Sequence, residues 1–271
     1  MIIPKEIQKK ANVERVRDQQ IEKDYILSWI LAGISQHVFL SKTLIFKGGT
    51  VLKKFYFEDY RFSEDLDFTL TDFEISKIEI IRCFDQTFDF IKEKANIPLE
   101  IAGDSEHDDG GFNFYIRYVG PLGGQQSSKK VKVDISRSEI LQFNPIIKSC
   151  FLQYSDLFEF QILCYSLEEI LVEKMRSVMQ RMQARDFYDI WYLLNFLNVD
   201  VNFFRNEFSN KCQIKGLNPA DFAKKIIERL PQYKLRWSAS LKDQIKDLPD
   251  FEQIERETLR VLKKLNFDNL K

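Results

Sequence analysis

Hydrophobic and polar residues follow two different periods in the first part of the chain, which predicts a mixture of helices and strands. Apolar residues recur at helical spacing over 14–40 and again over 74–95. The two-residue period of a strand covers three other stretches: 65–70, 112–119 and 130–136. A short apolar run at 44–46 precedes two glycines and an expected short helix at 50–56. We therefore expect helices and strands to fold together in this region.

The pattern changes after about residue 155, where helical spacing dominates. It covers four stretches: 167–182, 186–196, 218–230 and 251–265. Asn218 and Pro219 are residue types that favour the N-cap and the first position of a helix. We therefore expect an α+β fold with two domains. Residues 1–155 would form an α/β core with an N-terminal helix, and residues 156–271 a helical domain.

Composition excludes several classes of protein. The chain of 271 residues is 44% apolar, so it can bury a core and disorder is not expected. Its 40 Lys and Arg residues balance 41 Asp and Glu residues, so only local patches, such as 129–132 and 174–185, would bind RNA. The four cysteines form no Cys-x-x-Cys pair and there are only two histidines, which disfavours zinc sites and Ser-His-Asp hydrolases. No apolar run approaches the ~20 residues that span a bilayer, so we expect a cytoplasmic protein with reduced thiols and no membrane partner.

Two carboxylates, Asp65 and Asp67, stand two residues apart on the strand expected at 65–70. Residues at this spacing project from the same face, so both oxygens can converge on Mg²⁺, which binds a few carboxylates and fills its shell with water and phosphate. The alternative is a solvated strand face. Aspartate is a poor strand former, so two of them in one strand favour a functional site.

The turn Gly48-Gly49-Thr50 comes directly before the short expected helix. Exposed amides at such a position bind anions, helped by the helix dipole and here by a hydroxyl. An ordinary strand-to-helix turn is the alternative. The turn lacks both the Walker pattern and the Gly-x-Gly-x-x-Gly dinucleotide pattern, so those two folds are disfavoured.

A third carboxylate, Asp134, is the one acidic residue on the strand expected at 130–136. Sites that transfer phosphoryl groups with two metal ions use carboxylates for both ions. Asp134 is therefore a candidate for binding the second ion or activating the attacking hydroxyl. An ordinary charge on an edge strand is the alternative.

Basic residues in the helical region form the next candidate group. Lys174, Arg181 and Arg185 are spaced i, i+7 and i+11, which places them on one face if the helix is continuous. That face could neutralise a triphosphate, or it could be a solvated basic stripe. Asp186 and Asp189 follow, where they could cap and begin a second helix.

The order of these motifs resembles the AbiEii toxin family, including the related MenT toxins. The matching segments run from about residue 20 to about residue 195: Glu22-Lys23-Asp24-Tyr25, Phe46-Lys47-Gly48-Gly49-Thr50-Val51-Leu52, Arg61-Phe62-Ser63-Glu64-Asp65-Leu66-Asp67-Phe68, Val133-Asp134-Ile135, Glu173-Lys174-Met175-Arg176 and Arg185-Asp186-Phe187-Tyr188-Asp189-Ile190-Trp191. The resemblance implies a core like that of DNA polymerase β, with a helical C-terminal part that completes the nucleotide site. It also implies a type IV toxin–antitoxin or phage-defence role.

For site residues, the resemblance assigns metal-binding carboxylates and nucleotide contacts. The expected catalytic residues are Asp65, Asp67, Asp134, Lys174 and Asp186, the first three of which would bind metal. The expected nucleotide-binding residues are Lys47, Gly48, Gly49, Thr50, Ser63, Arg181 and Arg185. In some relatives the serine that matches Ser63 is a target of inhibitory phosphorylation.

The resemblance implies Mg²⁺-dependent transfer of a nucleoside monophosphate from an NTP to RNA. In MenT members the acceptor is the 3′ end of tRNA, which blocks aminoacylation and translation, and a cognate antitoxin would be a partner. Two alternatives stay open. One is an NTP-binding regulatory protein without transfer activity, and the other is a transferase that modifies a protein or a small molecule.

Overall fold

The structure, a computed structural model, describes residues 1–72, 74–124, 129–197 and 201–264. It divides into two compact units. The first comprises Met1–Glu139, Pro145–Tyr165 and Gln244–Lys246, and the second comprises Ile140–Asn144, Ser166–Asp243 and the residues from Asp247 onward. Leu265, the last residue of the helix expected at 251–265, lies outside the described residues.

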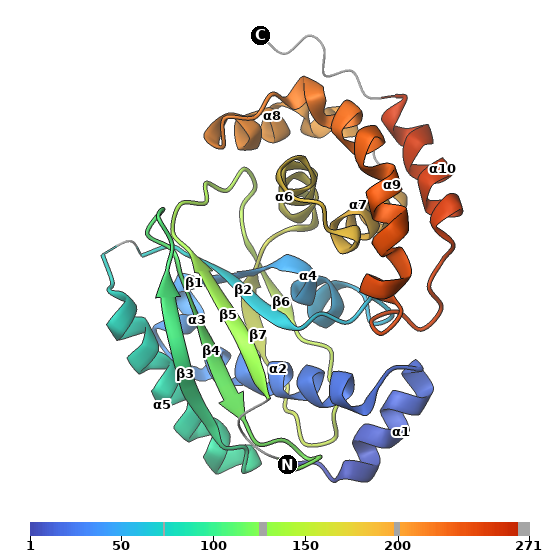
Figure 1. Ribbon diagram of the computed structural model, residues 1–271. Helices are drawn as coiled ribbons and strands as arrows, with labels where there is room; N and C mark the ends of the chain where they lie inside the picture. The colour runs from blue at the N-terminus through green and yellow to red at the C-terminus, as the bar shows by residue number, and fades with distance from the viewer. Residues whose placement is uncertain (73, 125–128, 198–200, 265–271) are drawn as a thin grey trace. The chain divides into compact units, whose positions relative to one another are not determined.

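A mixed sheet of seven strands, in the order β3-β4-β5-β2-β1-β7-β6, forms the centre of the first unit (Figure 1). The strands are β1 (Leu44–Lys47), β2 (Asp65–Leu70), β3 (Leu99–Glu106), β4 (Phe112–Tyr118), β5 (Lys130–Ser136), β6 (Ile146–Ser149) and β7 (Gln161–Cys164). The three alternating stretches of the sequence are confirmed as β2, β4 and β5. Strand β2 pairs in parallel with β5 and antiparallel with β1, so it lies near the middle of the sheet.

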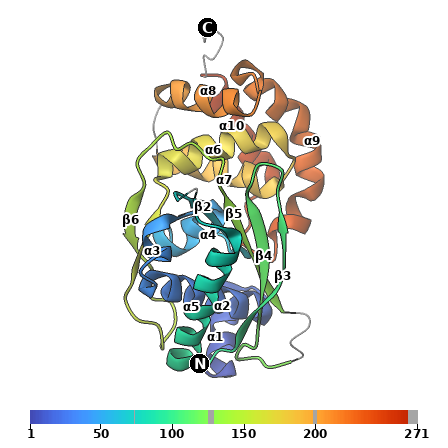
Figure 2. The same cartoon turned by 90° about the vertical axis from the view of Figure 1, so that its left-hand side faces the viewer.

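One face of the sheet is apolar and covered by helices. Leu66 of β2 and Val133 of β5 are apolar members of the alternating pattern on this face, and both are fully buried. Helix α5 (Lys77–Ala95) lies beside the sheet and contacts β3 (Figure 2). Phe84 of α5 packs edge-on against Phe114 of β4, with ring centroids 4.9 Å apart. The opposite face carries the polar members of the same strands, as the alternation predicts.

Other helices surround this sheet. They are α1 (Pro4–Glu14), α2 (Asp18–Gln36), α3 (Leu40–Thr43), α4 (Gly48–Val51) and a π-helical turn η1 (Leu52–Tyr56). The helix expected at 14–40 is confirmed as α2, which starts and ends inside those bounds, and α1 was not expected. The first helix starts with Pro4 and ends at Arg15, whose backbone is left-handed, and α2 begins three residues later. The short helix expected after the glycines is confirmed as α4 and η1.

The second unit is helical in all its described secondary structure. It contains α6 (Leu167–Gln180), α7 (Ala184–Leu197), α8 (Arg205–Ile214), α9 (Phe222–Leu241) and α10 (Phe251–Leu262), with 3₁₀ turns η2 (Val201–Phe204) and η3 (Pro219–Asp221). Phe187 of α7 stacks on Tyr233 of α9 with centroids 4.9 Å apart. The expected α+β fold with a helical C-terminal part is confirmed.

The boundary between the units differs from the expected division at residue 155. Strand β7 joins β1 in parallel, so the chain completes the sheet before it enters the helical unit at Ser166. Within the part of the chain that the structure describes, no helix has the length and apolar character needed to cross a membrane.

Candidate active site

The polar face of the first unit's sheet aligns charged residues in a row across four strands. Lys47 of β1 lies opposite Asp67 of β2, Asp67 lies opposite Asp134 of β5, and Asp134 lies opposite Asn113 of β4. Directly opposite residues have Cβ atoms about 5 Å apart. The strand register therefore places Lys47, Asp67 and Asp134 side by side, although they are far apart in the sequence.

A second row, one pleat along, contains Asp65 of β2, Lys132 of β5 and Tyr115 of β4. The Lys132 ammonium forms an ion pair with Asp134 at 2.8 Å. Burial lowers the pKa of Lys132, but the hydrogen bond to Asp134 and the charges of Asp134, Asp65 and Asp67 outweigh it, so the pKa is raised. All three predicted metal carboxylates therefore act electrostatically on one cation.

The glycine turn packs directly against this face. Gly48 has a φ of +85°, and a Cβ built there would overlap the Oδ2 atom of Asp67 and lie 3.1 Å from its Cγ. A Cβ on Gly49 would lie 2.6 Å from Arg61 Nη2 and 3.3 Å from Ser63 Oγ. The positive φ favours glycine at position 48, and a side chain at either position would displace the Asp67 carboxylate or the Arg61 guanidinium.

The side chains that flank the turn already have partners. The Thr50 hydroxyl donates to the Asp65 backbone carbonyl at 2.6 Å, which fastens α4 to the start of β2. Lys47 donates to Ser136 Oγ at 2.9 Å and lies 3.9 Å from Glu139. Lys47 is therefore held on the polar face, whereas the Thr50 hydroxyl serves to position the strand that carries Asp65.

These residues have the chemistry of a divalent-cation site. Asp65 and Asp67 share a face and supply the hard oxygen ligands that Mg²⁺ prefers. The Lys132 ammonium lies near these carboxylates and interacts electrostatically with both. Among the described residues, no group of three or more His, Cys, Asp or Glu side chains is arranged to hold a metal ion. Asp65 and Asp67 are thus the residues that could hold a divalent cation, and Asp134 is paired with Lys132.

The second unit brings together the other predicted group. The Lys174 ammonium lies 2.8 Å from Asp186 and 2.7 Å from Asp189, and Arg181 donates to Asp186 at 2.7 Å. Lys174 is only 8% exposed and both aspartates are fully buried. The solvated-stripe alternative is therefore wrong for Lys174, which is the centre of a buried ionic cluster.

The two helices expected at 167–182 and 186–196 are confirmed as α6 and α7, so Lys174, Arg181 and Arg185 do not share one continuous helix. Helix α6 ends at Gln180 and α7 begins at Ala184, so Arg181 lies in the break. Asp186 sits in the first turn of α7, from which it reaches back to Lys174 and Arg181. Burial raises the pKa of the Asp186 carboxyl, but Lys174 and Arg181 outweigh this and lower it. Arg185 is half-buried on α7.

Comparison with known proteins decides the family. A sequence model described as "Nucleotidyl transferase AbiEii toxin, Type IV TA system" matches residues 29–257. The chain belongs to the AbiEii family. Nucleotidyl transfer from an NTP and an antitoxin partner are the family's properties. No curated protein sequence matches the chain.

Solved structures show the same fold at low sequence identity. MenT4, a nucleotidyltransferase toxin from Mycobacterium tuberculosis H37Rv, is similar with a TM-score of 0.68 and 18% identity, over 100% of this chain and 91% of MenT4. JHP933 from Helicobacter pylori has a TM-score of 0.58 and 16% identity, over 92% of each chain. A putative nucleotidyltransferase from H. pylori has a TM-score of 0.57 and 16% identity, over 94% of this chain and 99% of its own.

Residue types alone did not reveal what the segment Glu22-Lys23-Asp24-Tyr25 does in this AbiEii-family chain. Buried Glu22 accepts from the Leu122 amide at 2.8 Å and pairs with Lys129 at 2.8 Å. Lys23 pairs with Glu64, the residue just before β2, at 2.8 Å. These two side chains therefore hold the segments next to β5 and β2.

The second half of the same segment anchors the turn. Asp24 pairs with Lys54 of η1 at 2.5 Å and accepts from Tyr154 at 2.6 Å, and both ionic partners are buried. Tyr25 donates to Asp156 at 2.8 Å. Burial raises the pKa of Asp24, but the charge and hydrogen bond of Lys54 and the hydrogen bond of Tyr154 outweigh it and lower the pKa. The signal in the sequence was three consecutive charged residues, 22–24, directly before the apolar stretch of the same helix.

Proposed function

We propose that this AbiEii-family toxin transfers a nucleoside monophosphate from a Mg²⁺-bound NTP to RNA, with the 3′ end of tRNA as the expected acceptor. Pyrophosphate would leave, and blocking the acceptor end would stop translation. The proposal places the reaction in the cytoplasm, as part of a toxin–antitoxin or phage-defence system with a cognate antitoxin.

The observation that carries this proposal is the contact between the glycine turn and Asp67. The backbone at Gly48 lies so close to the carboxylate that a Cβ has no room. A phosphate held by the amides of Gly48 and Gly49 would therefore lie beside the carboxylates that hold the metal. Nucleotidyl transfer requires this proximity, because catalysis of phosphoryl transfer is mostly positioning and electrostatic stabilisation.

In the proposed mechanism, each residue of the first unit has a separate task. Asp65 and Asp67 would hold Mg²⁺, which when bound neutralises charge on the phosphates. Lys47, opposite Asp67, would pair with a phosphate oxygen, and Thr50 would keep the turn fastened to β2. Asp134, opposite Asp67 on β5, would accept the proton of the attacking hydroxyl or bind a second ion. Ser63, beside Gly49, would border the phosphate site.

In the second unit, taken by itself, Arg181 and Arg185 remain the proposed nucleotide contacts. Lys174 and Asp186 form the buried part of their cluster, so we assign them the task of holding Arg181 in place. Arg181 is 53% exposed, and it can donate to a phosphate while Asp186 orients its guanidinium. Arg185, half-buried on the next helix, would add a second cation.

The test is transfer of α-phosphate label to defined acceptors. The protein is incubated with Mg²⁺, each of the four NTPs labelled at the α-phosphate, and total tRNA, and the products are separated into RNA, protein and small molecules. Label in RNA, lost with Asp67→Asn, is the expected result. Asn keeps the size of the side chain, so the variant reports the charge.

Two outcomes would refute the proposal. Label that enters only protein or a small molecule would favour a transferase with another acceptor. Nucleotide binding with no transfer to any acceptor would favour an NTP-binding regulatory protein.

A further inference from the structure

The polar face of the sheet continues beyond the proposed catalytic carboxylates onto β4. Lys132, opposite Asp65, is itself opposite Tyr115. Strands lie about 4.8 Å apart, so Tyr115 stands roughly 10 Å from Asp65 in the same row. In the next row, Lys130 of β5 lies opposite Arg117 of β4. An aromatic residue and two cations thus adjoin the place where transfer would occur.

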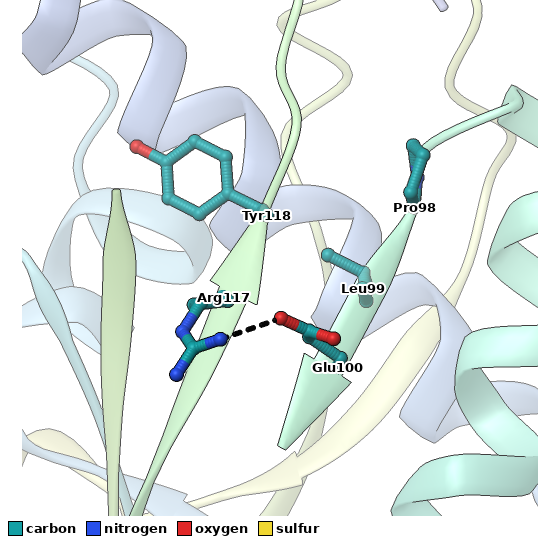
Figure 3. Close-up of a pocket in the computed structure, with 5 residues that line it drawn as sticks. All are labelled: Pro98, Leu99, Glu100, Arg117 and Tyr118. Carbon is teal, nitrogen blue, oxygen red and sulfur yellow. Dashed lines mark hydrogen bonds and ion pairs between the residues drawn. The ribbon is translucent and has the colours of Figure 1, made fainter. Parts of the chain in front are cut away.

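The contacts within this surface distinguish its members. The Lys130 ammonium lies 4.1 Å from the centroid of the Tyr115 ring. Lys130 is exposed, Tyr115 is half-buried, and within the described residues Lys130 has no carboxylate partner. Arg117, in contrast, is paired with Glu100 of β3 at 2.9 Å (Figure 3). The cation available for a new phosphate is therefore Lys130.

The outer edge of the surface is acidic and limits its width. Glu100 of β3 neutralises Arg117 on this face, whereas Asp104 and Glu106 lie opposite Phe114 and Phe112, on the other face of the sheet. The cavity beside the Arg117–Glu100 pair is only about 60 Å³, far smaller than a nucleotide needs (Figure 3). A duplex backbone would meet the Glu100 carboxylate, whereas one unpaired nucleotide needs only Tyr115 and Lys130.

We infer that Tyr115 and Lys130 bind the unpaired 3′ end of the RNA acceptor, an inference that rests on the proposed function. The Lys130 ammonium would move from the Tyr115 ring to the neighbouring phosphate, and the base would stack on the ring in its place. Aromatic side chains combined with cations are the usual means of binding single-stranded nucleic acid, because every base has a face that stacks. The Lys130 charge would attract any anion, and the Tyr115 ring beside it favours RNA over an acidic peptide, which has no base to stack.

The experiment measures RNA binding and NTP binding separately. A fluorescein-labelled RNA hairpin with an unpaired 3′ overhang is titrated with the protein by anisotropy, and NTP binding is followed by calorimetry. Tyr115→Ala should weaken RNA binding roughly 5- to 150-fold, as expected for loss of one stacked base. Tyr115→Phe keeps the ring and should bind as wild type. Lys130→Gln should lower the salt dependence of binding by about 0.7 in log–log slope, the share of one phosphate.

Lys148 offers a matched control for Lys130. Its ammonium lies 4.5 Å from the Tyr56 ring, a similar cation–π contact, but on β6 at the far end of the strand order. Lys148→Gln should leave RNA binding unchanged, and all variants should retain wild-type NTP binding. Lys130 is exposed, so its variant reports binding even if Tyr115→Ala fails to fold.

The outcomes separate this inference from the proposed function. Weaker RNA binding by Tyr115→Ala or Lys130→Gln with unchanged NTP binding supports it. If both variants keep the wild-type RNA affinity and salt slope while the wild-type protein extends RNA, the assignment of Tyr115 and Lys130 to RNA binding is refuted. The proposed function is then unaffected. A wild-type protein that neither binds nor extends RNA would overturn both.

Discussion

Replacing Gly48 by alanine tests the contact on which the proposed chemistry depends. The φ of +85° costs an alanine about 1–2 kcal/mol, because its Cβ is crowded in the left-handed region. The added methyl would also overlap Asp67 Oδ2, which must move. Pushing that side chain about 30° from its rotamer costs a further ~1 kcal/mol.

The chain contains a matched control for the backbone part of this effect. Gly110, in the turn between β3 and β4, has a φ of +80°, and a Cβ there would meet nothing within 4 Å. Gly110→Ala therefore carries the same conformational cost without the contact. The two variants should differ by ~1 kcal/mol of stability, or about 2–4 °C in Tm for a protein of this size.

Transfer activity should separate the variants more strongly than stability does. Displacing Asp67 by about 1 Å should lower transfer roughly 100-fold in Gly48→Ala, whereas Gly110→Ala should remain within about twofold of wild type. Thermal unfolding and α-phosphate transfer, measured on both variants below their Tm, check this. Equal Tm values and equal activities would refute the argument that Gly48 is required by its approach to Asp67.

Four further predictions follow from the ionic groups. Asp67→Asn should abolish transfer and leave Tm within a few degrees of wild type; a fully active variant would remove Asp67 from the metal site. The Lys132→Met variant should bind Mn²⁺, without nucleotide, roughly 3- to 10-fold more tightly by calorimetry. The Lys132 ammonium, worth up to about 1 kcal/mol per neighbouring carboxylate, no longer competes with the metal ion for the carboxylates. An unchanged Mn²⁺ affinity would contradict this. Asp24→Asn should lose roughly 3–5 kcal/mol at pH 7, because Lys54 stays buried without its partner. Folding lowers the pKa of Asp24, so its contribution to the free energy of unfolding is present above about pH 4 and is lost below it. The Tm of the wild-type protein should therefore fall with acid more steeply than the Tm of Asp24→Asn. Lys174→Met should destabilise the second unit by roughly 3–5 kcal/mol in chemical denaturation, since two carboxylates remain buried; a change of under 1 kcal/mol would show that the cluster is not structural.

The alternation of apolar and polar residues was enough to predict the strands that carry the candidate site. Strands β2 and β5 begin and end where the alternation does, because each is long enough to show a period of two and buries one face only. Strands β6 and β7 were missed because each has four residues, and β3 was missed although it has eight, with an irregular pairing to β4. Helix α9 was expected to stop before Pro231 but continues to Leu241, because Tyr233 and Trp237 beyond the proline pack on Phe187.

The sequence by itself determined the residue types and the faces: carboxylates two apart on a strand, and two glycines before a helix. It could not determine which side chains neutralise which, because those partners meet only through strand register and helix packing. Lys132 stands beside Asp65 because β2 and β5 pair in parallel across a long stretch of chain. Likewise, Lys174 is buried between two aspartates because the chain turns back after α6. Charge–charge energies depend on distance and burial, and both are properties of the tertiary structure alone.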